Sequence, residues 1–318
     1  MNPNATANLL PAGALLEEEQ NPDYDPKRFY PARIGETING KYQIISKLGF
    51  GTGSTVWLAE EMNRWPWQPS KYMALKITNC FEGDRKSANE ELQMSRHISQ
   101  IQSNHEDDLK ADNLLLGFED SSVIDGYAKA QRQNPGLYKE SDGRRIYQSQ
   151  PDFGHFSKGT GVLKISDFGA AVFGNTASLY YHDMQPEQFA ASEVLLGAGW
   201  TYSADIWNLG MVLWELLEDI SLLDGVGPEN KYDRQVHFAQ MIRLLGPPPA
   251  ELLERANKGV YAELYSEQGE FKHSQLMPPE DFTFESQAPS LQGEEKGLFI
   301  QFAQRMLKWV PEERATAK

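Results

Sequence analysis

Cysteine, long apolar runs and basic residues are all scarce in this 318-residue chain, and each shortage excludes a class of protein. The single cysteine excludes a disulfide framework and a cysteine-based zinc site, and it is typical of a reducing compartment. No stretch approaches the roughly 20 apolar residues that a membrane span needs. The apolar stretch Leu9–Leu16 has no basic residue before it, as a secretory signal would, because the first one is Lys27. We therefore expect no membrane association, and residence in the cytoplasm, the nucleus or both.

Acidic residues outnumber basic ones, with 45 Asp and Glu against 30 Lys and Arg, so the net charge is −15. A protein that binds the phosphate backbone of nucleic acids presents basic surface, so we expect no direct nucleic-acid partner. A charged partner would instead be basic, although acidity also simply keeps proteins soluble. The fractions of hydrophobic residues (40%) and charged residues (24%) are those of a globular protein, here with one large domain or two lobes. We expect it to be a monomer.

The first part of the chain reads as strands and the second as helices. Residues 42–48 and 54–58 are predicted strands that flank a glycine turn. A third strand over 71–77 would place Ala74 and Lys76 on one face, and three short consecutive strands favour an antiparallel sheet. The remaining expected elements are a helix at 87–101, a polar insertion at 118–160, a strand at 162–165, and helices at 204–217, 237–245, 250–256 and 296–308. The fold class is therefore α+β.

Two motifs in the first part of the chain are suited to binding phosphate. The glycines of Gly49-Phe-Gly-Thr-Gly-Ser54 let backbone amides approach phosphate oxygens without Cβ obstruction. Lys76, on a strand beneath that turn, can neutralise phosphates, and Glu91 on the following helix can orient it. Taken singly, a glycine turn is most often only a hairpin and a lysine most often lies in solvent.

Two further motifs are suited to phosphoryl transfer. In Asp108-Leu-Lys-Ala-Asp-Asn113, Asp108 can accept a hydroxyl proton, Lys110 can meet the transferring group and Asn113 can bind Mg²⁺. Asp167-Phe-Gly169, at the end of a strand, supplies another candidate metal ligand. Each is common alone as a cap or turn, and it is their order along the chain that carries the inference.

With all four in this order, the chain resembles the protein kinase family. Ala191-Ser-Glu193, Asp205-Ile-Trp-Asn-Leu-Gly210 and Pro311-Glu-Glu-Arg314 continue the resemblance, and in that family the last arginine pairs with the glutamate of the first. Within the CMGC group, the chain is similar to the SR-protein kinases, especially their fungal members. The resemblance to SR-protein kinases rests on the stretches Tyr30–Gly35, Lys47–Gly51 and Ser54–Leu58, and the resemblance to the CMGC group rests on His237–Pro249.

The resemblance implies a two-lobe kinase fold, with a small antiparallel N-lobe bearing one helix and a mostly helical C-lobe. It divides the chain into a flexible tail (1–28), a partial N-lobe (29–104) and a C-lobe (105–318) that contains the catalytic loop, the insertion and the activation segment. The implied reaction uses ATP and Mg²⁺ to phosphorylate serine in a basic, Arg/Ser-rich protein. The implied roles are catalysis by Asp108, Lys110, Lys76 and Glu91, nucleotide binding by Leu48, Gly49, Gly51, Ser54, Val56, Ala74 and Lys76, and metal binding by Asn113 and Asp167.

One spacing departs from this pattern. The spacing from Glu91 to Asp108 is only 17 positions, whereas similar kinases place about 70 or more residues between these two roles. The missing stretch would hold two strands, the hinge that reads adenine, and the helix that supports the catalytic loop. We therefore expect an incomplete kinase fold with an internal deletion and impaired activity. The alternative is a non-catalytic, kinase-like fragment that only binds partner proteins.

Overall fold

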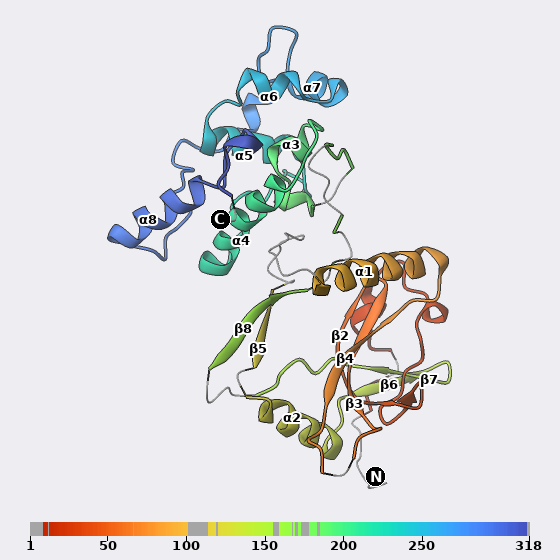
Figure 1. The fold of residues 1–318 in the computed structure, drawn as a ribbon. Helices are drawn as coiled ribbons and strands as arrows, with labels where there is room; N and C mark the ends of the chain where they lie inside the picture. Colours follow the sequence, from red (N-terminus) through yellow and green to blue (C-terminus); the bar gives the residue numbers. More distant parts are fainter. Residues whose placement is uncertain are drawn as a thin grey trace. The chain divides into compact units, whose positions relative to one another are not determined.

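The structure, a computed structural model, describes residues 9–11, 13–65, 67–100, 114–118, 120–154, 159–166, 168, 171–172, 178–182 and 185–316. Contacts divide the chain into two units, shown in Figure 1. The first unit comprises Met1–Leu92 and Leu116–Lys164, and the second comprises Gln93–Leu115 and Ile165–Lys318. The predicted boundary at residues 104 and 105 differs from this division, because residues 116–164 pack with the first part of the chain.

An antiparallel sheet of order β1-β2-β3-β4 forms the centre of the first unit. Successive residues of a strand point to opposite faces of the sheet, and here each face carries an apolar cluster. Trp57 and Tyr147 belong to the apolar cluster on one face, and Leu58 and Tyr127 belong to the cluster on the other. The strands are β1 (Thr37–Ile38), β2 (Tyr42–Gly51), β3 (Ser54–Glu61) and β4 (Tyr72–Thr78), and helix α1 (Glu82–Gln100) follows them.

The predicted insertion contains regular structure. It holds α2 (Ser122–Gln133) and a hairpin of β6 (Tyr138–Ser141) and β7 (Arg144–Tyr147), which pack on the first unit's sheet through Tyr127 and Tyr147. The hairpin turn uses Asp142 and Gly143, both at positive φ, as two-residue hairpin turns require. Strands β5 (Leu114–Phe118) and β8 (Thr160–Ile165) form a separate pair.

The segment predicted as a flexible tail is instead anchored over residues 13–28. Leu16 and Glu18 are both 8% exposed, and a short 3-10 helix spans Glu17–Gln20. Arg144 of β7 donates to the carbonyls of Pro26 and Phe29. The run of three glutamates reads as solvated from sequence alone, but lysines distant in the sequence meet it in the fold.

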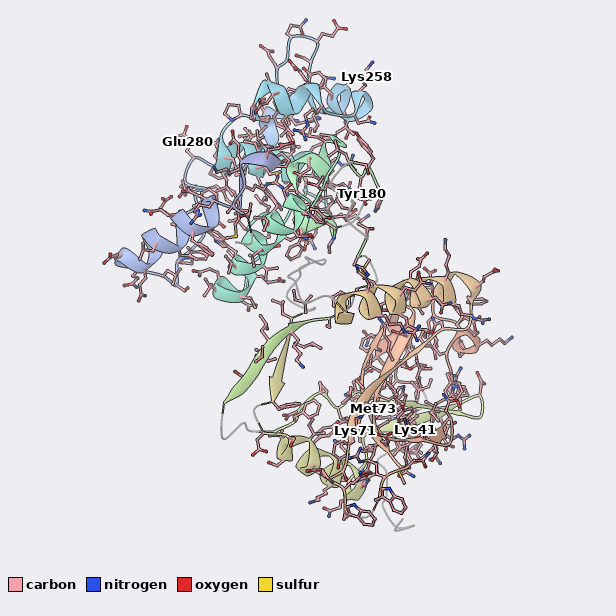
Figure 2. The ribbon with its side chains drawn as sticks, viewed as in Figure 1. Lys41, Lys71, Met73, Tyr180, Lys258 and Glu280 are labelled. Atoms are coloured by element: carbon pink, nitrogen blue, oxygen red, sulfur yellow. The ribbon has the colours of Figure 1, made fainter. Side chains whose placement is uncertain are left out.

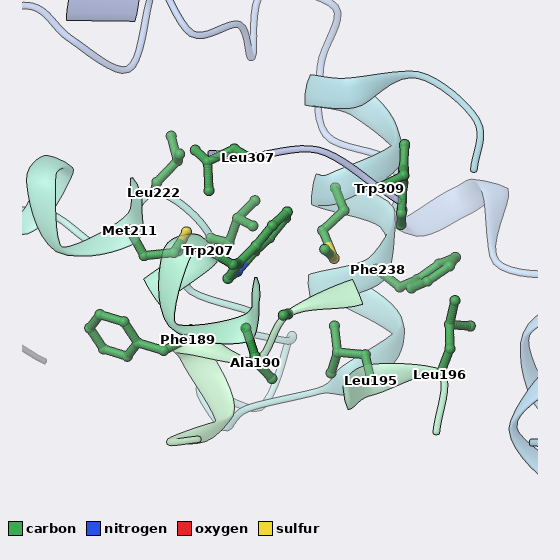
Figure 3. Packing of buried hydrophobic residues seen from close by; sticks show 14 of the residues in the cluster. Phe189, Ala190, Leu195, Leu196, Trp207, Met211, Leu222, Phe238, Leu307 and Trp309 are labelled. Carbon is green, nitrogen blue, oxygen red and sulfur yellow. The ribbon is translucent and has the colours of Figure 1, made fainter. Parts of the chain in front are cut away.

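The second unit is helical. Trp207 is fully buried at the centre of its core, with Met211, Leu222 and Leu307 around it (Figure 3). Tyr180, labelled in Figure 2, belongs to this unit. Its backbone pairs with that of Trp200. The helices are α3 (Ser192–Leu195), α4 (Ser203–Glu218), α5 (Arg234–Leu245), α6 (Ala250–Glu254), α7 (Lys258–Leu264) and α8 (Gly293–Gln304). No helix of the described residues is both long and apolar enough to cross a membrane.

Candidate active site

The predicted nucleotide residues of the first unit lie in one row across the sheet. Gly49 of β2 pairs with Val56 of β3, and Val56 pairs with Lys76 of β4. Directly paired residues point to the same face, so Val56 and Lys76 share a face, and Ala74 joins them two positions along β4. Leu48 packs against the apolar cluster on that face. The fold therefore brings together residues that the sequence separates by almost 30 positions.

The glycine turn is open at its base and closed at its tip. A Cβ added at Gly49 would meet no heavy atom within 4 Å in the part of the chain that the structure describes. At the tip, a Cβ on Gly53 would lie 3.3 Å from the Asp84 carboxylate of α1, and Gly51 pairs with Ser54 to close the hairpin. The space beside Gly49 where a side chain would lie is thus open, while the tip is held beside α1.

Lys76 and Glu91 form the contact that the sequence predicts. The ammonium of Lys76 lies 2.9 Å from both carboxylate oxygens of Glu91 on α1. The Lys76 side chain is 38% exposed and that of Glu91 is 21% exposed. A pair this exposed contributes only about 0–1 kcal/mol to stability, so its arrangement is better explained by orientation of the lysine than by folding. The catalytic roles of both residues stay predictions.

The other predicted catalytic and metal residues, Asp108, Lys110, Asn113 and Asp167, lie outside the described residues. Between Asn113 and Asp167 in the sequence, the described residues include the paired strands β5 and β8. A Cβ on Gly161 at the start of β8 would lie 2.9 Å from the carbonyl carbon of Gly117 near the end of β5. The two strands therefore run antiparallel, and Leu114 and Ile165 come to the same end of the pair.

In the second unit, Arg314 and Glu193 form the ion pair that the resemblance implies. Arg314 donates to both carboxylate oxygens, at 2.7 and 2.6 Å, and both side chains have 0% exposure. Arg314 also donates to the Ser203 carbonyl and to the Ser192 hydroxyl. The Ser192 hydroxyl in turn donates to the Trp309 carbonyl, so Ser192 joins the same network.

Lys47 is a residue that the sequence analysis did not single out. It lies just before the glycine turn, with a side chain only 1% exposed, and its ammonium contacts Glu17 and Glu18. Its signal in the sequence is faint: a single lysine in a mainly apolar strand, and a run of glutamates about 30 residues earlier. Neither feature alone predicts that the two segments meet.

Comparisons with known proteins agree with this geometry. The protein kinase domain model matches residues 105–318. A serine/threonine protein kinase of Aspergillus fumigatus is 30% identical over 374 aligned positions, covering 97% of this chain and 90% of the relative. The serine/threonine-protein kinase SRPK of Physarum polycephalum is 26% identical over 396 positions, covering 95% of this chain and 89% of the relative. The chain belongs to the protein kinase family, among the serine/threonine kinases.

A solved structure of a kinase domain has the same fold, with a TM-score of 0.61 at 19% identity, covering 92% of this chain and 96% of that one. The two-lobe kinase fold, with an antiparallel N-lobe sheet and a helical C-lobe, is thereby confirmed. Both alignments with the named relatives run over more positions than the 318 residues of this chain. The relatives therefore hold residues for which this chain has no counterpart.

Proposed function

We propose that this chain is an ATP- and Mg²⁺-dependent serine kinase of the SR-protein-kinase type, acting on Arg/Ser-rich proteins. The observation that carries the proposal is the Lys76–Glu91 pair beside the open backbone at Gly49, on one face of the sheet. An ammonium held by a carboxylate, on a sheet whose glycine turn leaves the side-chain position of Gly49 open, is suited to a triphosphate.

In this proposal Lys76 binds the α- and β-phosphates, Glu91 orients it, and the glycine turn covers the phosphates. Leu48, Val56 and Ala74 contact adenine. Asp108 accepts the proton as the serine oxygen bonds to the γ-phosphorus, and the bond from that phosphorus to the bridging oxygen breaks to release ADP. Lys110 stabilises the charge that develops on the transferring phosphoryl group, and Asn113 and Asp167 are the ligands of Mg²⁺.

The substrate class is supported by charge and by a relative's name. A net charge of −15 favours a basic partner, and one relative is named an SRPK. We further propose that activity is low, because the residues that only the relatives hold would include the adenine-binding hinge. Misplacement of catalytic groups by about 1 Å can cost about 10²-fold in rate.

Transfer of phosphate from γ-labelled ATP to an (Arg-Ser) repeat peptide tests the proposal. We expect slow incorporation that requires Mg²⁺, with an (Arg-Ala) peptide as the blank and a (Lys-Ser) peptide as the poorer substrate. Lys76→Met should reduce incorporation by roughly 10²-fold, as loss of one electrostatic contact to the transferring group does. Equal rates for the wild type and Lys76→Met would overturn the assignment.

The alternative, a non-catalytic binding module, is favoured by the shortness of the chain relative to its aligned relatives. It predicts binding of the (Arg-Ser) peptide with no incorporation of label. A Mg²⁺-dependent rise in melting temperature at millimolar ATP separates the two hypotheses, since a ligand that binds the native state stabilises it by mass action. No shift and no transfer, with the peptide still bound, would support the binding module.

A further inference from the structure

The strand that leads into the glycine turn has an unusual local geometry around Lys47. The pairing of β2 with β3 shifts register twice, between Ile44 and Ser46 and again between Lys47 and Gly49. Such irregularities re-aim side chains and recur next to active sites. Here they flank a lysine that lies two residues before Gly49 and is 1% exposed. A buried ammonium is costly unless every N–H finds a partner.

All three donors of Lys47 are used. Its ammonium lies 2.8 Å from Glu17 Oε2, 2.6 Å from Glu18 Oε2 and 3.0 Å from the carbonyl of Tyr147. An ammonium has three N–H groups and no acceptor, so this set saturates it. The ring of Phe50, in the glycine turn itself, lies 5.6 Å from the same nitrogen, within the range of a cation–π contact.

The two glutamates belong to a short N-terminal arm, residues 13–28, that is fixed at other points. Glu17 accepts from the backbone N–H of Ser149 at 2.6 Å and from its hydroxyl at 2.7 Å. Glu19 pairs with Lys139 of β6 at 2.8 Å, with side chains 8% and 4% exposed, and accepts from the Leu16 N–H. The arm therefore links β2 to the hairpin β6–β7 and to the segment that follows it.

The backbone around Lys47 is tied to the same segment. The N–H of Gln150 donates to the Lys47 carbonyl at 2.8 Å. The hydroxyl of Tyr127 on α2 donates to the Gln150 carbonyl at 2.6 Å and lies 2.8 Å from the hydroxyl of Ser46. Three segments distant in the sequence thus converge on the two residues at the base of the glycine turn.

We propose that the Glu17–Glu18–Lys47 cluster positions the glycine turn over Lys76. A well-packed apolar cluster would stabilise the sheet as well as a buried ion pair does, so stability alone does not explain the charges. Oriented ion pairs instead fix the direction in which the strand enters the turn, and binding by backbone amides depends on such preorganisation. The cluster acts through the turn and does not touch the nucleotide. The proposal rests on the proposed function, since it concerns the same phosphate site.

The matched comparison is between two neutralised clusters on the same arm. The test variant, Glu17→Gln/Glu18→Gln/Lys47→Met, removes every charge of the cluster without leaving an unpaired one. The control, Glu19→Gln/Lys139→Met, neutralises a similarly buried ion pair that joins the same arm to β6. Both are assayed for unfolding midpoint, for binding of Mg²⁺·tripolyphosphate by calorimetry, and for amide hydrogen exchange over residues 47–55.

We expect the test variant to bind tripolyphosphate about tenfold more weakly and to exchange amides over 47–55 about tenfold faster than the wild type. The control should match the wild type within twofold in both, whatever its midpoint. Unchanged amide exchange in the test variant overturns the proposal. So does a loss of tripolyphosphate binding in both variants that follows the fall in their unfolding midpoints. Because exchange needs no ligand, this outcome is separate from failure of the proposed function, which would appear as a wild type that binds no tripolyphosphate.

Discussion

At the scale of single residues, this chain uses buried and exposed charges for different purposes. Arg314 and Glu193 are wholly buried, and each guanidinium nitrogen has a partner, because Nε donates to the Lys308 carbonyl. Lys76 and Glu91 form a similar contact at the surface of a sheet. A buried pair is costly to break, whereas an exposed pair can exchange its partner for a ligand at little cost.

The first prediction concerns the buried pair. Arg314→Met leaves the Glu193 carboxylate buried without a counter-charge, so the free energy of unfolding should fall by about 3–5 kcal/mol. Arg255→Met is the control, because Arg255 pairs with Glu312 at the surface, with side chains 32% and 62% exposed, and should cost under about 1 kcal/mol. Urea unfolding measures both. Similar losses in the two variants would show that the buried network is not what fixes this part of the C-lobe.

The second prediction concerns pH. Burial lowers the pKa of His237 from 6.5 to about 4, opposed by the backbone of Glu187 and the charge of Asp224. Its Nδ1 lies 2.9 Å from the Tyr232 hydroxyl. The unfolded chain therefore binds a proton below about pH 6.5 that the folded chain resists until about pH 4. Stability should be fully present above pH 6.5 and should fall by about 2 kcal/mol on going to pH 5.

Urea unfolding between pH 5 and 8 checks this expectation. The variant His237→Gln has no titrating ring at that position, so its stability should vary less over the same range, although its starting stability will be lower. If wild type and variant show the same slope, other groups cause the pH dependence.

At the scale of elements, a glycine lies where α4 packs against residues 306 and 307. A Cβ on Gly210 would lie 2.8 Å from Leu307 Cδ2 and 3.4 Å from Met306 Cβ, and both side chains are 3% exposed. Gly297 on α8 faces no heavy atom within 4 Å among the described residues. Gly210 and Gly297 both lie in helices of the second unit, but only Gly210 is packed closely by other side chains among the described residues.

The third prediction uses this contrast. In Gly210→Ala the gain in helix propensity, about 1 kcal/mol, is outweighed by overpacking of about 1–3 kcal/mol, so the variant should be less stable by up to about 2 kcal/mol. Gly297→Ala should gain up to about 1 kcal/mol. Thermal unfolding of the two variants measures the difference, and a stabilised Gly210→Ala would mean that the packing of α4 against Leu307 is loose.

The elements were predictable where local patterns decide them. Alternation and glycine predicted strands at 42–48, 54–58 and 71–77 with antiparallel pairing, and the structure has them at 42–51, 54–61 and 72–78. Periodicity predicted helices at 204–217 and 237–245, which correspond to α4 and α5. Helix ends were less predictable, since α8 spans 293–304 instead of 296–308. At its C-terminal end the Arg305 carbonyl accepts from the Ala315 N–H and the Lys308 carbonyl accepts from the Arg314 side chain, instead of continuing the helix. The insertion's α2 and hairpin lacked a clear pattern because their packing partners are distant.

At the site, the sequence predicted contacts between residues close in the chain and contacts between residues of the family's motifs. It did not predict the other contacts. The Lys76–Glu91 contact followed from a strand and the helix after it. The anchoring of residues 13–28 could not be predicted in this way, because the partners are far apart in the sequence. Lys47 lies 29 residues from Glu18, and Lys139 lies 120 residues from Glu19. Long-range ion pairs have no periodic signature, so a glutamate run reads as solvated.

At the scale of the whole molecule, the chain is an acidic protein kinase with fewer residues than its aligned relatives. The fourth prediction follows from charge. Affinity for an (Arg-Ser) repeat peptide, measured by fluorescence anisotropy, should fall several-fold when salt is raised from about 50 to about 200 mM, because screening weakens long-range attraction. A citrulline-serine peptide of the same length should show little change. Equal salt dependence for both peptides would argue against electrostatic recognition.

The central proposal is that this chain keeps the triphosphate half of a kinase nucleotide site, built on Lys76, Glu91 and the glycine turn, while the adenine half is incomplete. Calorimetric titration with Mg²⁺·ATP and with Mg²⁺·tripolyphosphate tests it most directly. The account predicts that the two bind within about tenfold of each other, a difference of about 1.4 kcal/mol at most, and that Lys76→Met weakens both. ATP binding more than a hundredfold tighter than tripolyphosphate, or binding indifferent to Lys76→Met, would contradict it.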